Sequence, residues 1–288
     1  MRFGLVGCLL ALAALSAVPP AVATPLDPRL QAVESFAFAI GNHALNGDVA
    51  ERYRETDLVV FDGQEAKRAD IRAVHAQGGV VLAYLSVGTI ETYRPWYRLL
   101  KAYRLEAWKD WKGEFYADVS RRGYRRAIVR KVAPPLLAKG FDGLFLDNTD
   151  MIEAPRYRSE TRGMRNLIAS LATLTHSGGG LLFAQNGASM IGPSLPYLDG
   201  WNREDVSYTY DFDRHRYAPV RPADHREAIR ELHQIAAASL LVTATDYLRS
   251  GGGEREAQAV AAACAAGALP YVSDIGLRRV PPQPLTCG

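Results

Sequence analysis

Several features that mark large protein classes are missing from this sequence. Its 288 residues include only three cysteines, with no C-x-x-C pair and no Cys/His cluster, so a structural zinc site is not expected. Neither H-E-x-x-H nor G-x-S-x-G occurs, which leaves zinc-protease and serine-hydrolase chemistry without a motif. No nucleic-acid type block of Lys and Arg stands out, and the net charge is only +3, so we expect no nucleic-acid partner.

Long apolar runs are also scarce, because the only one lies at the N-terminus. A basic start is followed by an apolar run over residues 3–18, and the small residues 21–23 fit a signal-peptidase site. The run is short for a bilayer span and its exit is proline-rich, so we favour a signal peptide over residues 1–23 to a membrane anchor. The mature chain, residues 24–288, would then be secreted or periplasmic, free of the membrane, and folded as one domain.

Two of the three cysteines, Cys264 and Cys287, lie outside that N-terminal segment. In an oxidising compartment they could form a disulfide that ties the C-terminal tail to the last predicted helix. A core Cys264 with a free Cys287 is the alternative, and the sequence does not decide between them. Cys8 matches a lipoprotein box only superficially, because it comes before the apolar run has developed, and we assign it to the signal peptide.

The rest of the chain alternates short apolar runs with segments of helical spacing. Most of the runs are continuously apolar, as expected for strands that are buried on both faces of a parallel sheet. Pro134 and Pro135 should kink or split the helix in which they fall. The predicted strands cover residues 36–41, 58–63, 80–87, 143–148, 181–186, 198–204, 239–246 and 269–274, and the predicted helices cover residues 64–77, 120–139, 160–176, 224–238 and 254–266.

Eight strands that alternate with helices predict an α/β fold with a single (β/α)8 TIM barrel. A doubly wound open sheet is the second possibility for such a pattern. That fold would be expected to carry a glycine-rich phosphate-binding loop after its first strand, and residues 41–44 (GNHA) do not form one. The barrel is therefore the favoured architecture.

Acidic and amide residues follow nearly every predicted strand. In a TIM barrel the C-terminal ends of the strands meet on one rim, where catalytic residues gather. A single acid at such a position is usually a helix cap or a solvated loop residue, but six or seven on one rim exceed what capping explains. The main residues are Asp62, Tyr84, Glu91, Asp147, Asn148, Asp150, Asn186, Glu204, Asp246 and Tyr247.

Two of these acids are candidates for cleaving a glycosidic bond. That reaction needs one carboxyl group to protonate the leaving oxygen and a second to attack the anomeric carbon or to activate water. Asp147 ends the most apolar strand, so we expect it to be buried and to act as nucleophile or base. Glu204 is the candidate general acid. The plain structural alternatives are a helix N-cap for Asp147 and an exposed loop residue for Glu204.

The loops of the same rim are rich in Trp and Tyr. Aromatic rings stack on the apolar faces of sugars, although ordinary packing would explain each ring equally well. Acids beside aromatic rings also suit a cationic ligand, such as an amino sugar. The aromatic residues concerned are Tyr93, Trp96, Tyr97, Trp108, Trp111, Trp201, Tyr208 and Tyr210.

Two other functions are compatible with the sequence. A barrel that has lost the paired acids could bind carbohydrate without cleaving it. A hydrolase could instead use Asp62, Asp147 and Asp150 to hold magnesium or calcium. None of the six histidines has the spacing of a metal-binding pair, so we expect no metal and no other cofactor.

Three segments of the sequence form a distinctive combination when they are taken together. They are Leu58–Asp62 (LVVFD), Val81–Gly88 (VLAYLSVG) with Glu91-x-x-Arg94-Pro95, and Gly140–Gly143 (GFDG) leading to Asp147-Asn148-x-Asp150. In this combination the chain resembles glycoside hydrolase family 114, the endo-α-1,4-polygalactosaminidase-like TIM-barrel proteins. The resemblance extends over most of residues 36–275.

The resemblance implies a hydrolase of α-linked polysaccharide that contains galactosamine or a related amino sugar, and we expect it to act as a monomer. The family's two acids would be Asp147 and Glu204. Family members often carry Glu-Pro before the first acid and Lys-Asn after the fifth strand, where this chain has Phe-Leu (145–146) and Gln-Asn (185–186). The expected substrate-binding residues are Asp62, Tyr84, Glu91, Asp118, Asn148, Asp150, Asn186, Trp201, Asp246 and Tyr247.

Overall fold

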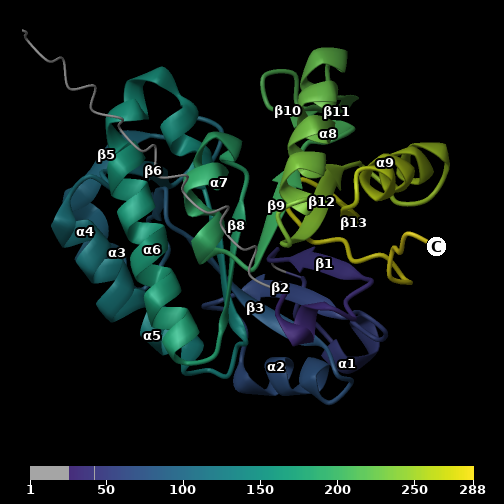
Figure 1. Cartoon of the computed structure of the whole chain (residues 1–288), viewed down its shortest axis with the longest axis horizontal. Coiled ribbons are helices and arrows are strands. Elements are labelled where there is room, and N and C mark those ends of the chain that lie inside the picture. The colour runs from purple at the N-terminus through teal and green to yellow at the C-terminus, as the bar shows by residue number, and fades with distance from the viewer. Residues whose placement is uncertain (1–25, 42) are drawn as a thin grey trace, which may run out of the picture.

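A computed structural model describes residues 26–41 and 43–288, so the predicted signal peptide lies outside the described residues. Eight parallel strands form the central sheet, and their spatial order follows their order along the chain (Figure 1). A doubly wound sheet would reverse that order at a switch point, so the predicted (β/α)8 barrel is confirmed. The strands are β1 (Phe36–Ala39), β2 (Leu58–Asp62), β3 (Val80–Ser86), β7 (Gly143–Asp147), β8 (Leu181–Gln185), β9 (Gly200–Glu204), β12 (Leu241–Tyr247) and β13 (Leu269–Ser273).

Helices surround the barrel, and the one that contains Pro134 and Pro135 is split as the sequence predicts (Figure 1). It consists of α4, a π-helical turn over Ile128–Val132, and α5. Within the described residues, no helix is both long and apolar enough to cross a bilayer. The helices are α1 (Val49–Arg52), α2 (Arg68–His75), α3 (Tyr97–Leu100), α4 (Arg122–Ala127), α5 (Ala133–Leu137), α6 (Thr161–Ser177), α7 (Ala188–Ser194), α8 (Pro222–Ala236) and α9 (Glu254–Ala265).

Two small β-structures that the sequence did not predict are inserted after barrel strands. A three-stranded antiparallel sheet of β4 (Thr89–Glu91), β6 (Glu114–Ala117) and β5 (Arg104–Ala107) follows β3. A hairpin of β10 (Tyr208–Asp211) and β11 (Arg216–Pro219) follows β9. Their strands are three or four residues long and β5, β6, β10 and β11 are largely half-buried or exposed, so they lack the apolar runs that reveal the barrel strands. Both insertions leave the C-terminal ends of their strands and therefore flank the mouth of the barrel.

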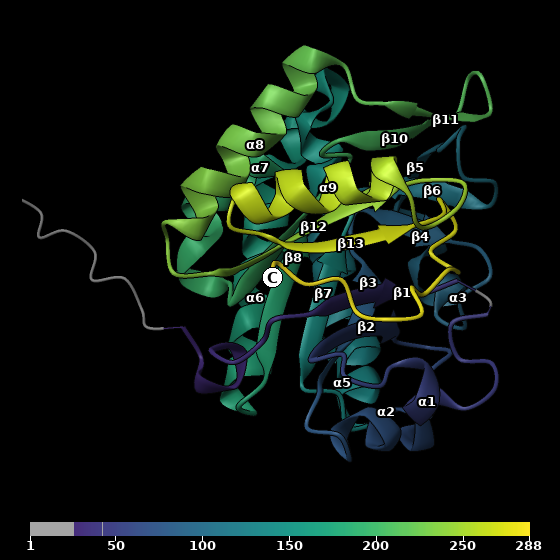
Figure 2. The same ribbon diagram turned by 90° about the vertical axis from the view of Figure 1, so that its right-hand side faces the viewer.

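The barrel has one seam, between its first and last strands. No ladder joins β1 to β13 in the part of the chain described, and the rings of Phe36 and Tyr271 pack across the gap with centroids 5.9 Å apart. The C-terminal tail that follows β13 runs beside β1 (Figure 2). The Gly41 amide donates to the Leu277 carbonyl, and the Tyr271 hydroxyl donates to the Arg279 carbonyl. The tail thus contacts both sides of the seam.

Two features hold the tail in place. A Cβ atom at Gly41 would lie 2.3 Å from the Gly276 carbonyl oxygen, so only glycine permits this approach of the tail. Cys287 forms a disulfide with Cys264 on α9, with their Cα atoms 5.3 Å apart, so the structure pairs the two cysteines that the sequence left undecided. The tail is therefore fixed at its near end by packing and at its far end by a covalent bond.

We predict that the Cys264→Ser/Cys287→Ser double variant is less stable than the wild type by about 3 kcal/mol, because the disulfide closes a loop of moderate length in the unfolded chain. Urea unfolding measures the difference. A reducing agent should lower the free energy of unfolding of the wild type to that of the variant. It should leave the stability of the variant unchanged. Equal stability of the oxidised wild type and the variant would show that the bond does not constrain the chain.

Candidate active site

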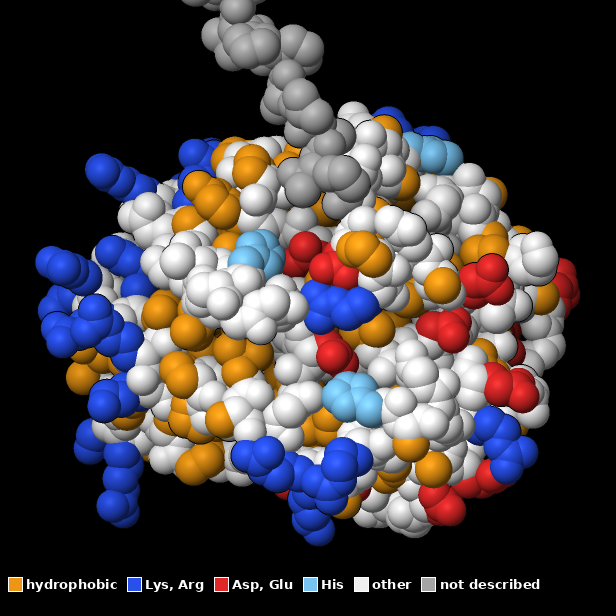
Figure 3. Space-filling view, turned by 60° about the horizontal axis from the view of Figure 1, so that its bottom comes forward, with side chains coloured by type: hydrophobic (Ala, Val, Ile, Leu, Met, Phe, Trp, Pro, Cys, Tyr) orange, Lys and Arg blue, Asp and Glu red, His pale blue; other side chains and the backbone are white. Residues whose placement is uncertain are grey.

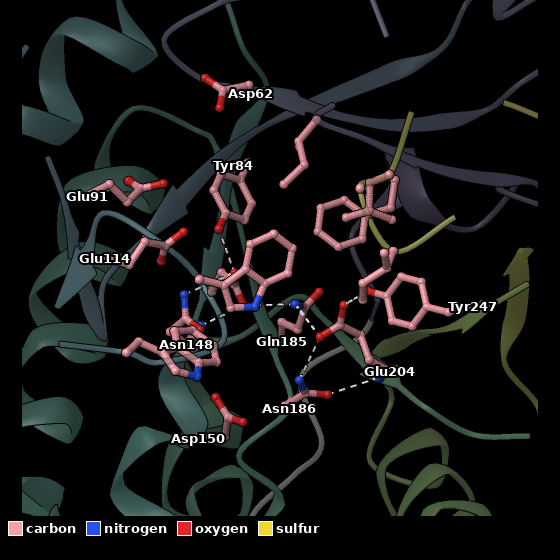
Figure 4. A pocket seen from close by; sticks show the side chains of 18 of the residues that line it. Asp62, Tyr84, Glu91, Glu114, Asn148, Asp150, Gln185, Asn186, Glu204 and Tyr247 are labelled. Atoms are coloured by element: carbon pink, nitrogen blue, oxygen red, sulfur yellow. Dashed lines mark hydrogen bonds between the residues drawn. The ribbon is translucent and has the colours of Figure 1, made fainter. Parts of the chain in front are cut away.

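A pocket lies at the C-terminal ends of the barrel strands (Figure 4). It encloses about 460 Å³, which is within the range of roughly 300–1,000 Å³ found for ligand sites. Its walls carry eight acidic residues and a single basic residue, Arg94. The acids are Asp62, Glu65, Glu91, Glu114, Asp147, Asp150, Glu204 and Asp205.

Asp147 is the last residue of β7, and its carboxylate accepts hydrogen bonds at both oxygens. The Tyr84 hydroxyl donates to Oδ2 over 2.6 Å, and the backbone amide of Asn148 donates to Oδ1 over 2.6 Å. Asn148 adopts a left-handed conformation with φ 59°, and Gly88 packs against its backbone, where a Cβ atom would clash. The chain around Asp147 is thus folded tightly and positions the carboxylate within the pocket.

Glu204 ends β9 and is held by donors on two neighbouring strands. The Tyr247 hydroxyl on β12 donates to Oε1. The Asn186 side chain, which follows β8 in a left-handed conformation with φ 51°, donates to Oε2 over 2.9 Å and accepts from the Glu204 backbone amide. Its carboxylate therefore has a fixed orientation.

The Gln185 amide joins the two acids (Figure 4). Its Nε2 donates to Asp147 Oδ1 over 2.8 Å and to Glu204 Oε2 over 2.7 Å. The orientation of this amide follows from the buried layer beneath it, because Asn202 donates to Gln185 Oε1 over 2.9 Å. The Thr243 hydroxyl on β12 in turn donates to Asn202 over 2.7 Å. A hydrogen-bonded chain from the barrel interior thus directs one nitrogen at both carboxylates.

The environment raises the pKa values of both acids. Burial raises the pKa of Asp147, against the hydrogen bonds from Tyr84 and Asn148 that stabilise its charged form. Burial also raises the pKa of Glu204, and the carboxylates of Asp147 and Asp205 raise it further. Because a neutral amide connects the pair, no cation offsets their repulsion there. One proton shared by the two acids is favoured over two ionised carboxylates.

Arg94 links two other acids of the pocket. Its Nη1 donates to both oxygens of Asp62 at 2.8 and 2.7 Å, and its Nε and Nη2 donate to Glu91 at 2.7 and 2.8 Å. All three side chains are buried, so this is a closed ion triad. Asp62 and Glu91 line the pocket, as the sequence predicted, but their charges are already compensated.

The inserted β-structures contribute residues that the sequence reasoning missed. Glu114 on β6 points toward the pocket near Tyr84 and Asn148 (Figure 4), and burial raises its pKa to about 7. Phe212, which follows β10, also lines the pocket. Of the predicted aromatic residues, Tyr93, Trp108 and Trp111 line it too. The segment that contains Glu114 has no strand-like pattern, so its position at the rim could not be predicted from the sequence.

Three predicted substrate-binding residues lie outside the pocket lining, which corrects the sequence prediction. Trp201 is fully buried and donates to the Asn186 carbonyl, so its ring cannot stack on a sugar. Asp246 is buried and accepts hydrogen bonds from the backbone amides that follow Val206. Its burial raises its pKa to about 7. Asp118 accepts from the Ser120 hydroxyl beside the inserted sheet. The other predicted substrate-binding residues, Asp62, Tyr84, Glu91, Asn148, Asp150, Asn186 and Tyr247, line the pocket.

The alternative of a metal site used Asp62, Asp147 and Asp150. In the structure Asp62 accepts a hydrogen bond from Arg94. Asp147 accepts hydrogen bonds from Tyr84 and Gln185. Among residues 26–41 and 43–288, no group of three or more His, Cys, Asp or Glu residues is arranged to hold a metal ion. Asp150 remains in the pocket, where burial raises the pKa of its carboxyl group to about 7.

Comparison with curated proteins gives a relative that matches most of the chain. The chain is 27% identical to an uncharacterized protein of Deinococcus radiodurans over 290 residues, which cover 91% of this chain and 89% of the relative. Two solved structures are similar in fold. The glycoside hydrolase domain of PelA from Pseudomonas aeruginosa superposes with a TM-score of 0.70 at 24% identity, covering 85% of this chain and 96% of that one.

The second structure is Aspergillus fumigatus Ega3 in complex with galactosamine, with a TM-score of 0.67 at 15% identity over 91% of this chain and 97% of that one. At these identities the superpositions establish the fold alone. The sequence model of the glycoside hydrolase family GH114 matches residues 16–283. This match covers most of the chain and agrees with the barrel and its paired acids: the protein belongs to glycoside hydrolase family GH114.

Proposed function

We propose that the protein hydrolyses an α-linked polysaccharide that contains galactosamine or a related amino sugar, and that Asp147 and Glu204 carry the reaction. The observation that supports this most directly is the Gln185 amide, which holds the two carboxyl groups beside each other in the pocket. Hydrolysis of a glycosidic bond needs two carboxyl groups with different protonation states. The raised pKa values of this pair favour one proton between them.

The charge of the pocket supports a cationic substrate. Eight acids line it, and Arg94, the one basic residue among them, is already bound by two of those acids. A neutral sugar could donate hydrogen bonds from its hydroxyl groups to these acids, whereas a protonated amine would also neutralise part of their charge. Trp108 and Trp111 offer rings to the apolar faces of the sugar. A galactosamine complex of Ega3 is consistent with this substrate class.

The separation of the acids supports a retaining mechanism. The two oxygens that share Gln185 Nε2 cannot be farther apart than the sum of two hydrogen bonds of 2.8 and 2.7 Å. Inverting enzymes place their carboxyl groups about 6.5–9.5 Å apart to admit a water molecule, and retaining enzymes about 5–5.5 Å. In the proposed first step an Asp147 oxygen bonds to the anomeric carbon while Glu204 gives its proton to the leaving oxygen. In the second step Glu204 takes a proton from water, whose oxygen displaces Asp147.

Export of the protein is part of the proposal. The apolar run over residues 3–18 followed by small residues supports a cleavable signal, and the Cys264–Cys287 disulfide suits an oxidising compartment. Such a location would bring the enzyme to extracellular polysaccharide.

We predict that Asp147→Asn abolishes hydrolysis, because the amide cannot form the covalent intermediate, while the protein stays folded. The test measures reducing ends released from purified α-1,4-linked galactosamine polymer. Asp118→Asn is the matched control, since it makes the same change outside the pocket and should keep full activity. Turnover by Asp147→Asn at the wild-type rate would refute the assignment. Polymer binding by the wild type without any release of reducing ends would instead support the non-catalytic alternative.

We predict that the product released first keeps the α configuration. Proton NMR of the anomeric signal during the first minutes of hydrolysis distinguishes the two outcomes, because mutarotation follows more slowly under buffered conditions. An initial β product would contradict the short separation of Asp147 and Glu204 as the working geometry, without affecting the identity of the two acids.

We predict that Tyr247→Phe moves the alkaline limb of the kcat/KM profile to higher pH. The general acid works only while protonated, so activity falls as the pH rises through the pKa of Glu204. The Tyr247 hydroxyl stabilises the charged form of Glu204 and lowers its pKa, so removing the hydroxyl raises that pKa. Tyr271→Phe is the control, because it removes a buried hydroxyl that donates to the Arg279 carbonyl instead. A shift of the limb to lower pH would contradict the role of Glu204.

A further inference from the structure

One outer face of the barrel carries a concentration of positive charge that the net charge of +3 conceals. We call it the basic face and define it by nine exposed Arg and Lys side chains in three segments. Residues 98–101 contribute two of them, residues 121–131 contribute five, and residues 162–165 contribute two. These segments belong to α3, to α4 with the turn that follows it, and to α6.

The fold places the three segments next to one another. Helix α4 contacts both α3 and α6, and all three lie on the left of the molecule in Figure 1. In Figure 3, Lys and Arg side chains gather along that same left edge, whereas Asp and Glu lie mainly toward the other half. Five of the nine charges come from the one segment 121–131, and the fold sets the other two segments beside it. The barrel unites them on one surface.

The three segments of this face carry no acidic residues of their own. Residues 97–105, 119–141 and 161–177 contain no Asp or Glu. In the described part of the chain, none of the nine side chains of the basic face takes part in an ion pair. Like charges at this density repel one another, which destabilises the free protein. An anionic partner would relieve that repulsion.

The basic face lies apart from the carboxylate pocket. None of its nine side chains lines the carboxylate pocket, and they project from the outside of three helices. The apolar side of α4, with Tyr124 and Ala127, is buried against the barrel, so this helix cannot insert into a bilayer. Leu99 is 45% exposed and lies between Arg98 and Lys101, which gives the face one apolar contact at its edge. The charge of the face carries the argument, because clusters of Lys and Arg attract a protein to a membrane that contains anionic lipid.

We propose that the basic face binds the surface of a membrane rich in anionic phospholipid. Arg and Lys would contact lipid phosphates, and Leu99 would enter the headgroup region. This contact is peripheral and electrostatic, so it needs no membrane-spanning anchor, but it departs from the expectation of a mature chain free of the membrane. Because the basic face excludes the residues that line the pocket, the acidic mouth stays open to substrate while the protein is bound.

Co-sedimentation with vesicles tests the proposal. The full chain is mixed with vesicles of phosphatidylcholine alone or with 30% phosphatidylglycerol, so that the neutral vesicles measure any binding through the apolar N-terminal run. The wild type should bind the anionic vesicles more tightly and lose this preference at high salt. The variant Arg122→Gln/Arg126→Gln/Arg130→Gln should bind them at least ~10-fold more weakly. Its hydrolysis of soluble polymer should equal that of the wild type.

The matched control removes the same charge elsewhere. Arg226→Gln/Arg249→Gln/Arg255→Gln neutralises three exposed arginines on and near α8 and α9, and it should bind anionic vesicles as the wild type does. Equal weakening by both triple variants would overturn the proposal, because net charge alone would then explain binding. Tight binding of duplex DNA at a salt concentration that abolishes vesicle binding would also overturn it, and would assign the basic face to a nucleic acid.

Discussion

The pocket depends on one neutral amide. Gln185 donates from a single nitrogen to Asp147 and to Glu204, and it can do so only because Asn202 occupies its oxygen. The orientation of Asn202 is fixed by hydroxyl groups of Thr243 and Thr245 in the fully buried interior. A misplaced amide in such a layer would leave buried polar atoms unpaired, at a cost of roughly 1–3 kcal/mol each. The barrel core therefore fixes how closely the two acids approach each other.

Much of the site follows from sequence because the rule for parallel strands is simple. Strand ends share a rim, so Asp147, at the end of an apolar run, and Glu204, at the end of a more polar predicted strand, could be expected on the same rim. The alternation of side chains along a strand could have improved this prediction. Asn202 and Glu204 point into the barrel on β9, so Trp201 must point away, and on β12 Tyr247 points inward while Asp246 does not. If the prediction had taken only every second residue of each strand as facing the barrel interior, it would not have included Trp201 and Asp246 in the site.

Other features of the site could not be predicted from the sequence by these rules. Glu114 reaches the pocket on an inserted sheet of short, half-exposed strands, whose pairing arises from tertiary contacts. The charge distribution also depends on the fold. A net charge of +3 results from an acidic mouth and a basic outer face, each assembled from segments far apart in the chain. Summing charges over a sequence gives no sign of such a separation.

The tail that contacts both sides of the seam between β1 and β13 also lines the pocket. Ile275, Gly276 and Leu277 form part of the pocket wall, and they belong to the tail whose far end is fastened by the Cys264–Cys287 bond. Reduced thiols would leave that wall held by the packing at Gly41, by the hydrogen bonds across the seam and by the ion pair of Arg279 with Glu256. The bond therefore connects α9, on the outside of the barrel, to the tail that forms part of the pocket wall, so two cysteines that lie outside the pocket lining help to hold that wall.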